Sequence, residues 1–312
     1  MSNSKNIEIP GYFRDKIKRE FGKEGKKWLD NLPDLLKRCL EKWNIKEGEI
    51  GENLSYNLIC FGISPEWGKV VIKIGVPHPD LFSEMTAISL YRGKNICRCY
   101  DKDEELGAMV LEKISPGFDL TFLDSDKDKI EIASDLITNL YIKIDKIYGL
   151  PAYGEWLDKA FTGAREMNIA GEKMYSLIDT AEEFFQELEA EDFPRVLLHG
   201  DLHHFNILKD REKDWRIIDP KGVIGIPVLE PARFMENQLH MIKEQEKLEC
   251  LNYMIKIFSK KLKVSPEFTA KALLVDYVLS TCWSFEEQAP PEKLRQELQG
   301  NINDCELILD YI

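Results

Sequence analysis

Three oxygen-bearing side chains follow short apolar runs in the middle of the chain. Asp201 and Asn206 lie five residues apart in one loop, and Asp219 comes directly after the next apolar run. Transfer of a phosphoryl group needs such a set, because one carboxylate orients the attacking hydroxyl while an amide oxygen and a second carboxylate hold Mg²⁺ on the phosphates. Mg²⁺ prefers oxygen ligands and keeps some waters, so one Asn and one Asp can suffice. The spacing of Asp201, Asn206 and Asp219 therefore predicts a site for phosphoryl transfer.

The same loop offers other interpretations, which the spacing makes less favourable. Alone, Asp201 would most often cap a helix or a turn. The adjacent His203 and His204 lack a third ligand for a zinc site, so we interpret them as supports of the loop. We expect His199 to form a structural hydrogen bond rather than to act as a general base.

A lysine interrupts an apolar run further upstream. Lys73 lies in the run 69–75, which together with 54–62 and a Pro/Gly turn predicts a β-hairpin. A buried lysine is costly unless it is paired, and a helix expected to begin after Pro79 offers Glu84 as its partner. We therefore predict that Lys73 contacts nucleotide phosphates and that Glu84 holds it in place. The alternative is a lysine that snorkels at a sheet edge.

Further nucleotide contacts are expected around this hairpin. No Gly-x-Gly-x-x-Gly motif precedes it, so backbone N–H groups and the short side chains of Ser55 and Asn57 would cap the phosphates. The run 107–112 predicts another buried strand. The chain leaving that strand, at Glu112 and Ile114, would present backbone groups to the adenine edge.

Helical periodicity dominates the rest of the chain. Apolar residues recur at helical spacing in these stretches: 12–46, with interruptions at Gly22 and Gly25 and a restart at Leu32-Pro33; 126–148; about 155–190; 232–262; 266–288; and 291–311. The chain has 312 residues, which suits a protein of two lobes. We expect an α+β fold with an N-terminal nucleotide-binding lobe, 1–112, that carries a helical extension, and a C-terminal catalytic and substrate-binding lobe, 113–312.

Charge and composition restrict the possible partners. Residues 1–112 hold 18 Lys and Arg against 18 Asp and Glu, so residues 113–312 carry the whole net charge of −13. This disfavours nucleic acid or an anionic membrane and favours a small cationic ligand. No apolar run approaches the roughly 20 residues that span a bilayer, and the N-terminus has no apolar signal segment. Seven scattered cysteines predict a reducing, cytoplasmic environment.

The central motifs resemble those of a known group of enzymes. The run HGDLHHFNIL at 199–208, followed by IDPKG at 218–222, resembles the aminoglycoside phosphotransferase group of the protein-kinase-like superfamily, and most closely the streptomycin 6-kinase (aminoglycoside/hydroxyurea resistance kinase) family. The likeness extends to 25–33, 71–75 and Trp283, and so covers nearly the whole chain. It implies a two-lobed fold with a small β-sheet N-lobe and a larger, mainly helical C-lobe, and it implies ATP (or GTP) and Mg²⁺ as cofactors.

The resemblance also implies roles for single residues. Asp201 would be the catalytic base, Asn206 and Asp219 the Mg²⁺ ligands, and Lys73 the contact to the α- and β-phosphates, fixed by Glu84. The γ-phosphoryl group would pass to a hydroxyl of an aminoglycoside-like, streptomycin-type antibiotic. Apart from the resemblance, acidic residues of the second lobe are expected to hold the amines or guanidines of the acceptor. The candidates are Glu230, Glu236, Glu286 and Glu287, with Trp283 as a stacking wall. The alternative is that they are surface acids and a core tryptophan.

The sequence departs from related patterns in two places. Phe205 stands where small-molecule kinases of this group often have Gly, which bears on how open the acceptor side is. Pro220-Lys221 replaces the Phe-Gly of protein kinases and argues against a mobile activation segment. Lys221 could reach phosphate or substrate, or pair with a surface acid.

Two other functions stay open at this point. The acceptor could be a cellular metabolite such as an amino alcohol, a sugar or an amino acid. The chain could also be a nucleotide-binding pseudokinase that acts as a regulatory module, although the complete set of five site residues argues against it. The sequence does not predict the oligomeric state.

Overall fold

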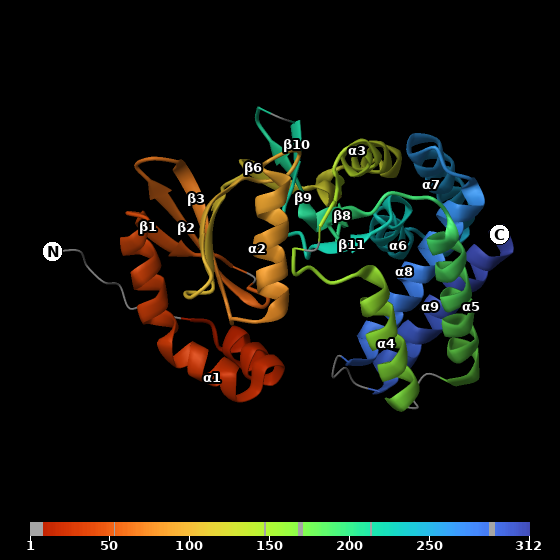
Figure 1. Cartoon of the computed structure of the whole chain (residues 1–312), viewed down its shortest axis with the longest axis horizontal. Coiled ribbons are helices and arrows are strands. Elements are labelled where there is room, and N and C mark those ends of the chain that lie inside the picture. The colour runs from red at the N-terminus through yellow and green to blue at the C-terminus, as the bar shows by residue number, and fades with distance from the viewer. Residues whose placement is uncertain (1–8, 53, 147, 168–170, 213, 287–290) are drawn as a thin grey trace. The chain divides into compact units, whose positions relative to one another are not determined.

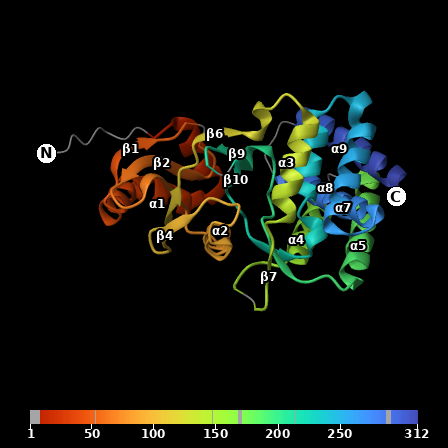
Figure 2. The same ribbon diagram turned by 90° about the horizontal axis from the view of Figure 1, so that it is seen from above.

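The computed structural model of the chain describes residues 9–52, 54–146, 148–167, 171–212, 214–286 and 291–312, and leaves the side chains of 286 and 291–295 aside. The chain divides into two compact units, unit 1 from Met1 to Gly117 and unit 2 from Phe118 to Ile312 (Figures 1 and 2). The functional division expected at 112/113 stays a prediction.

Unit 1 is built on a five-stranded sheet. Its strands are β1 (Lys46–Ile50), β2 (Asn57–Ser64), β3 (Gly68–Gly75), β4 (Cys99–Asp103) and β5 (Ala108–Glu112), in the order β1-β2-β3-β5-β4. The β2–β3 hairpin pairs Asn57 with Gly75 and Ser64 with Gly68, which confirms the predicted hairpin. At its turn the Ser64 hydroxyl accepts hydrogen bonds from the N–H groups of Glu66 and Trp67, and Gly68 adopts a φ of +74°.

One face of this sheet packs against α1 (Gly11–Lys42). The helix kinks where predicted, at Gly22 with a φ of 53°, but it continues through Pro33 without the expected restart. Next to the kink, a Cβ at Gly25 would lie 2.5 Å from the Ile17 carbonyl oxygen, so only glycine fits there. The core between helix and sheet is formed by these buried side chains: Phe13, Ile17, Trp28, Leu29, Leu32 and Leu36 of α1 with Leu58, Cys60, Val70, Ile72 and Ile74 of the hairpin.

The other face of the sheet carries Lys73 and lies toward α2 (Pro79–Tyr91). Side chains alternate along a strand, so the burial of Ile72 and Ile74 against α1 turns Lys73 the opposite way. The predicted start of α2 after Pro79 is nearly correct, because Pro79 is its first residue and His78 caps it by accepting the Asp80 N–H at 3.4 Å.

Unit 2 is mainly helical, with two small sheets. One sheet has the order β10-β9-β6 and the other β11-β8-β7. The strands are β6 (Pro116–Asp119, which begins at the end of unit 1), β7 (Ile142–Lys143), β8 (Val196–Leu198), β9 (Ile207–Asp210), β10 (Asp214–Ile217) and β11 (Val223–Gly225). The helices are α3 (Asp126–Thr138), α4 (Tyr153–Met167), α5 (Gly171–Ala190), α6 (Ala232–Met241), α7 (Lys247–Leu262), α8 (Pro266–Glu286) and α9 (Pro291–Tyr311), with short 3₁₀ turns η1 (Leu120–Phe122), η2 (His204–Asn206), η3 (Pro227–Leu229) and η4 (Glu244–Glu246).

Helix α8 is the centre of unit 2. It contacts α4, α5, α6, α7 and α9, among which it lies in Figure 1. Its residues from Ala270 to Leu279 are all buried. A helix that is covered on every side has apolar residues all around it, rather than on one face only. Any polar side chain in this run must therefore find its partner inside the unit.

Some predicted helices differ from the structure. The helix predicted over 126–148 ends at Thr138. The next residue, Asn139, donates its backbone N–H to the Ile137 carbonyl oxygen and its side-chain amide to the Asp135 carbonyl oxygen. The apolar residues beyond belong to β7, in which Ile142 pairs with Leu197 of β8, and periodicity alone does not separate so short a strand from a helix. Each of the stretches 155–190 and 232–262 contains two helices. Strands β1, β4, β6 and β11 were not predicted.

The core of unit 1 makes a testable prediction for α1. Leu36 is 1% exposed, so Leu36→Ala should lower the free energy of unfolding by about 2–5 kcal/mol through lost burial and a cavity. Chemical denaturation followed by circular dichroism measures the loss. The control is Lys37→Ala on the next residue, whose side chain is 73% exposed and should change stability by less than about 0.5 kcal/mol. Equal midpoints for the two variants would contradict the packing of α1 on the sheet.

Candidate functional site

The loop that carries Asp201 follows the buried strand β8. Gly200 has a φ of +77°, and a Cβ there would lie 2.7 Å from the Trp156 ring and 2.9 Å from a Val223 methyl group. Only glycine therefore allows the sharp turn at this position. The turn brings Asp201 out of the strand with its side chain 27% exposed.

His199 fixes this loop against the loop of Asp219. Its Nδ1 accepts the Asp201 N–H at 3.2 Å, so the proton is on Nε2, which donates to the Ile218 carbonyl oxygen at 2.8 Å. Burial lowers the pKa of His199 to about 4, which keeps the ring neutral and this tautomer in place. The expected structural hydrogen bond is thus present, and it joins the residues beside both candidate carboxylates.

Asn206 completes the connection. Its side-chain Nδ2 donates to the Asp201 carbonyl oxygen at 2.9 Å, and its own carbonyl oxygen accepts the Ile218 N–H at 2.9 Å. Within the described residues its Oδ1 has no hydrogen-bond partner, which leaves an oxygen free to bind a cation. Asp219 follows with a φ of 59°, a conformation that Asp tolerates better than most residues and that is often found at functional sites. The structure therefore brings all three residues of the central motif together.

The charge of Asp201 is balanced by Lys221. Burial opposes the ionised form, but the nearby ammonium of Lys221 holds the pKa of Asp201 below its ordinary value. The Lys221 Nζ lies 3.5 Å from the Asp201 Oδ2 and 4.9 Å from the centre of the Trp283 ring. Of the possibilities that the sequence left open for Lys221, the structure shows a pair with an acid, and that acid is Asp201 itself.

A buried ionic cluster lies next to this pair. The Arg233 guanidinium contacts Glu236 Oε2 at 3.0 Å and Asp276 Oδ1 at 3.3 Å, and the Tyr153 hydroxyl donates to Asp276 at 2.5 Å. The ring of Trp283 lies 5.3 Å from the guanidinium carbon of Arg233. Sequence reasoning missed Tyr153, Arg233 and Asp276. The available signal was Asp276 itself, an acid inside the apolar run of α8 that must be paired if it is buried.

The predicted acceptor residues fall into two groups. Glu230 and Glu236 are buried: Glu230 accepts the His199 N–H at 2.7 Å, and Glu236 binds Arg233 and the Ser280 hydroxyl. Trp283 is half-buried, with its ring edge-on to Trp156 at 5.5 Å. The side chain of Glu286 and the whole of Glu287 lie outside the described residues. Contact of any of them with an acceptor stays a prediction.

Unit 1 contains the predicted pair of Lys73 and Glu84. The Lys73 Nζ lies 2.6 Å from Glu84 Oε1, and the two residues are 3% and 8% exposed. The strand thus carries a buried ammonium group that the following helix neutralises, rather than a lysine that snorkels at an edge. Its contact with a nucleotide stays a prediction.

The other predicted nucleotide contacts of unit 1 have structural partners of their own. The Ser55 hydroxyl accepts a hydrogen bond from Lys16 at 3.1 Å, and Glu112 accepts the Arg98 N–H at 3.0 Å. Asn57 lies over Gly75, where a Cβ would come within 2.3 Å of its Oδ1. Ile114 is buried. Their nucleotide roles also stay predictions.

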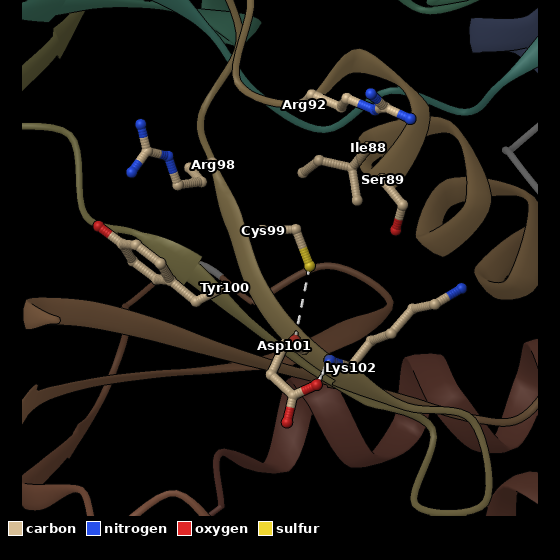
Figure 3. A pocket seen from close by; sticks show the side chains of 8 residues that line it. All are labelled: Ile88, Ser89, Arg92, Arg98, Cys99, Tyr100, Asp101 and Lys102. Atoms are coloured by element: carbon tan, nitrogen blue, oxygen red, sulfur yellow. Dashed lines mark hydrogen bonds between the residues drawn. The ribbon is translucent and has the colours of Figure 1, made fainter. Parts of the chain in front are cut away.

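A hollow of about 470 Å³ lies between the end of α2 and β4 (Figure 3). Its lining residues are Ile88, Ser89, Arg92, Arg98, Cys99, Tyr100, Asp101 and Lys102, and none of them belongs to the predicted site. The carboxylate of Asp101 accepts the indole N–H of Trp43, the residue after α1, at 2.8 Å.

Two features are absent from the described residues. This part of the chain contains no group of three or more His, Cys, Asp and Glu side chains that is arranged to hold a metal ion. A metal ion bound by Asn206 and Asp219 would therefore need other oxygen ligands to complete its coordination shell. None of the described helices combines the length and the apolar character that a membrane span requires.

Comparison with known sequences identifies relatives. A sequence model of the aminoglycoside/hydroxyurea antibiotic resistance kinase family matches residues 45–288. Streptomycin 6-kinase of Streptomyces griseus is 26% identical over 235 residues, which cover 73% of this chain and 74% of that protein. Hydroxyurea phosphotransferase of Kitasatospora aureofaciens is 26% identical over 231 residues, which cover 72% of this chain and 66% of that protein.

Comparison with solved structures identifies the fold. Choline kinase LicA from Streptococcus pneumoniae has a TM-score of 0.65 at 16% identity, covering 88% of this chain and 99% of that one. Aminoglycoside phosphotransferase APH(4)-Ia has a TM-score of 0.60 at 15% identity, covering 89% and 98%. A thermostable mutant of the latter forms a ternary complex with ADP and hygromycin B. The predicted protein-kinase-like fold, with a β-sheet N-terminal part and a mainly helical C-terminal part, is confirmed.

The buried pair of unit 1 makes a prediction about stability. Glu84→Gln removes the carboxylate charge that lies 2.6 Å from the buried Lys73 ammonium and should lower the free energy of unfolding by about 3–5 kcal/mol. The matched control is Glu41→Gln, because Glu41 forms an exposed pair with Lys37 in the same unit and should cost less than about 1 kcal/mol. Denaturant unfolding of both variants measures the difference, and similar small losses would show that the Lys73 charge is not buried.

Glu230 makes a prediction about pH. Burial raises its pKa to about 8 against the opposing hydrogen bonds from the His199 and Gly200 N–H groups. The folded state therefore binds a proton that the unfolded state has lost, and stability falls as pH rises from about 4.5 to 8, with a limit of about 1.4 kcal/mol per pH unit for one group. Glu230→Gln should make the slope shallower in this range. The exposed Glu183→Gln should leave it unchanged, and equal slopes in wild type and Glu230→Gln would contradict the assignment.

Proposed function

Because the chain belongs to the aminoglycoside/hydroxyurea antibiotic resistance kinase family, we propose that it transfers the γ-phosphoryl group of ATP to a hydroxyl of a streptomycin-like aminoglycoside. The resemblance seen in residues 199–222 is confirmed at the level of the family, and the chain is a phosphotransferase that acts on a hydroxyl group. The nature of the nucleotide, the metal and the acceptor is part of the proposal.

The observation that carries the proposal is the hydrogen-bonded set in unit 2. Asn206 donates to the Asp201 carbonyl oxygen, and the backbone next to Asp219 bonds to both His199 and Asn206. A carboxylate held in this way, with its pKa below the ordinary value, is ionised at neutral pH and can accept a hydrogen bond from an acceptor hydroxyl. Asp201 would thus orient the hydroxyl for in-line attack on the γ-phosphorus.

The remaining residues would position the nucleotide. Asn206 Oδ1 and the Asp219 carboxylate would hold Mg²⁺, which when bound neutralises charge on the phosphate oxygens. The fit rests on the unpartnered Oδ1 of Asn206 and on the oxygen chemistry of both side chains. Lys73, kept in place by Glu84, would contact the α- and β-phosphates. Catalysis of this kind depends on position and charge rather than on covalent chemistry with the protein.

The charge distribution supports a cationic acceptor. Residues 113–312 carry the whole net charge of −13, so the long-range field of this part favours amines and guanidines. Streptomycin-type aminoglycosides meet this requirement. Hydroxyurea is a second candidate acceptor because a relative of similar identity is a hydroxyurea phosphotransferase.

The proposal predicts the effect of removing the Asp201 carboxylate. With ATP, Mg²⁺ and streptomycin, the wild-type protein should add one phosphoryl group to the antibiotic, as measured by mass spectrometry. Asp201→Ala should lower kcat by about 10²–10⁴-fold, the usual size of a general-base contribution, while Mg²⁺-ATP binding measured by calorimetry stays close to wild type. The control is Asp158→Ala, an exposed acid on α4, which should keep full activity.

Three other outcomes would change the assignment. Undiminished turnover by Asp201→Ala would remove Asp201 from its role. Transfer to hydroxyurea, choline or another hydroxylated metabolite, and not to streptomycin, would keep the chemistry and change the acceptor. Tight nucleotide binding without transfer to any of these acceptors would favour a regulatory nucleotide-binding module.

A further inference from the structure

The side chain of Lys221 occupies a defined place in unit 2. Its ammonium lies 3.5 Å from Asp201 Oδ2 and 4.9 Å from the centre of the Trp283 ring. A carboxylate together with an aromatic face is the combination that binds the ammonium or guanidinium group of a ligand. The Lys221 ammonium therefore occupies a position that also suits a small organic cation.

This lysine is held more loosely than the buried lysines of the same unit. Lys247 contacts Asp304 at 2.5 Å and Lys271 contacts Glu187 at 2.6 Å, and their side chains are 12% and 9% exposed. The Lys221 side chain is 46% exposed, and its distance to Asp201 is longer than the 2.7–2.9 Å of a charge-assisted hydrogen bond. Moving it away should therefore require little free energy.

The second cation on Trp283 cannot move in the same way. Arg233 is buried and is fixed by Glu236 and Asp276, with its guanidinium carbon 5.3 Å from the Trp283 ring. Trp283 thus contacts one buried cation, Arg233, and one partly exposed cation, Lys221. The position of the partly exposed cation is the one that a ligand could take over.

The backbone of Lys221 can stay in place while its side chain moves. Pro220 precedes it, and the next residue, Gly222, has a φ of +77° and donates its N–H to the His199 carbonyl oxygen at 3.1 Å. The flexible four-carbon stem of lysine alone can carry the ammonium away. No rearrangement of the loop of Asp219 is needed for the exchange.

We propose that Lys221 is a resident cation on the acceptor side of Asp201, and that a positively charged group of the acceptor displaces it from Asp201 and Trp283. The inference rests on the proposed function for the role of Asp201. It makes Lys221 a residue that determines specificity: a cationic acceptor replaces one charge by another beside the carboxylate, whereas a neutral acceptor leaves the lysine in place.

The experiment compares Lys221→Met and Lys221→Arg with the control Lys209→Met. Like Lys221, Lys209 contacts both a carboxylate and an indole ring: it pairs with Asp214, and its ammonium lies 5.1 Å from the centre of the Trp215 ring. Unlike Lys221, it lies outside the site. Streptomycin is titrated into each protein by calorimetry without nucleotide, and kcat and KM are measured for streptomycin and ATP. Lys221→Met should bind streptomycin about three- to tenfold more tightly, since no resident cation must leave. Lys221→Arg keeps a cation beside Asp201 and should therefore not gain this affinity. Lys209→Met should resemble wild type.

Other results would overturn the proposal. Equal or weaker streptomycin binding by Lys221→Met would show that the lysine does not compete with the ligand. A higher KM for ATP, or a lower kcat with unchanged streptomycin affinity, would assign Lys221 to the phosphates instead.

The binding data also separate this proposal from the proposed function. If wild type binds streptomycin without phosphorylating it, the proposed function fails, while the binding constants still decide the role of Lys221. If streptomycin does not bind at all, the same titration with methylguanidinium chloride decides it. Tighter binding of that cation to Lys221→Met supports displacement, and equal binding overturns it.

Discussion

One neutral imidazole links the two loops of the candidate site. His199 accepts a hydrogen bond from the Asp201 N–H and donates one to the carbonyl oxygen of Ile218, the residue before Asp219. Only the tautomer with its proton on Nε2 makes both bonds, and burial keeps the ring in this neutral form. A side chain that need not take part in the reaction thus joins the backbone segments that carry the two carboxylates.

Charges are buried next to the candidate site residues in both units. These buried ion pairs, from which water is almost excluded, are formed by Lys73 with Glu84 and by Arg233 with Glu236 and Asp276. Apolar residues of similar volume often stabilise a protein as well as such pairs do, so stability alone does not account for them. Their positions account for them. Glu84 fixes Lys73 on the central strand, and the cluster of Arg233, Glu236 and Asp276 supports the ring of Trp283.

Short-range features of this structure could be predicted from sequence, and long-range ones could not. Lys73 and Glu84 lie eleven residues apart on a strand and the following helix, so their pairing followed from local pattern and the cost of a buried charge. Arg233 and Asp276 are 43 residues apart, and their pairing depends on how α6 and α8 pack. Strand β7 was not predicted for the same reason, because Leu197, which pairs with its Ile142, is more than 50 residues away in the sequence. Glu230 was predicted as an acceptor contact, and no local pattern indicates that its carboxylate accepts the His199 N–H.

The packing of α1 has a practical consequence for shortened forms of the protein. The segment that matches the family begins at residue 45, after α1 has ended, and stops at 288, before α9 begins. A fragment cut to these limits would keep the central motif, yet it would expose the sheet face formed by Leu58, Val70, Ile72 and Ile74, and uncover α8 where α9 contacts it. Large bare apolar faces promote aggregation. The ends of a soluble recombinant fragment are therefore dictated by the helices that cover these faces, and not by the extent of sequence likeness.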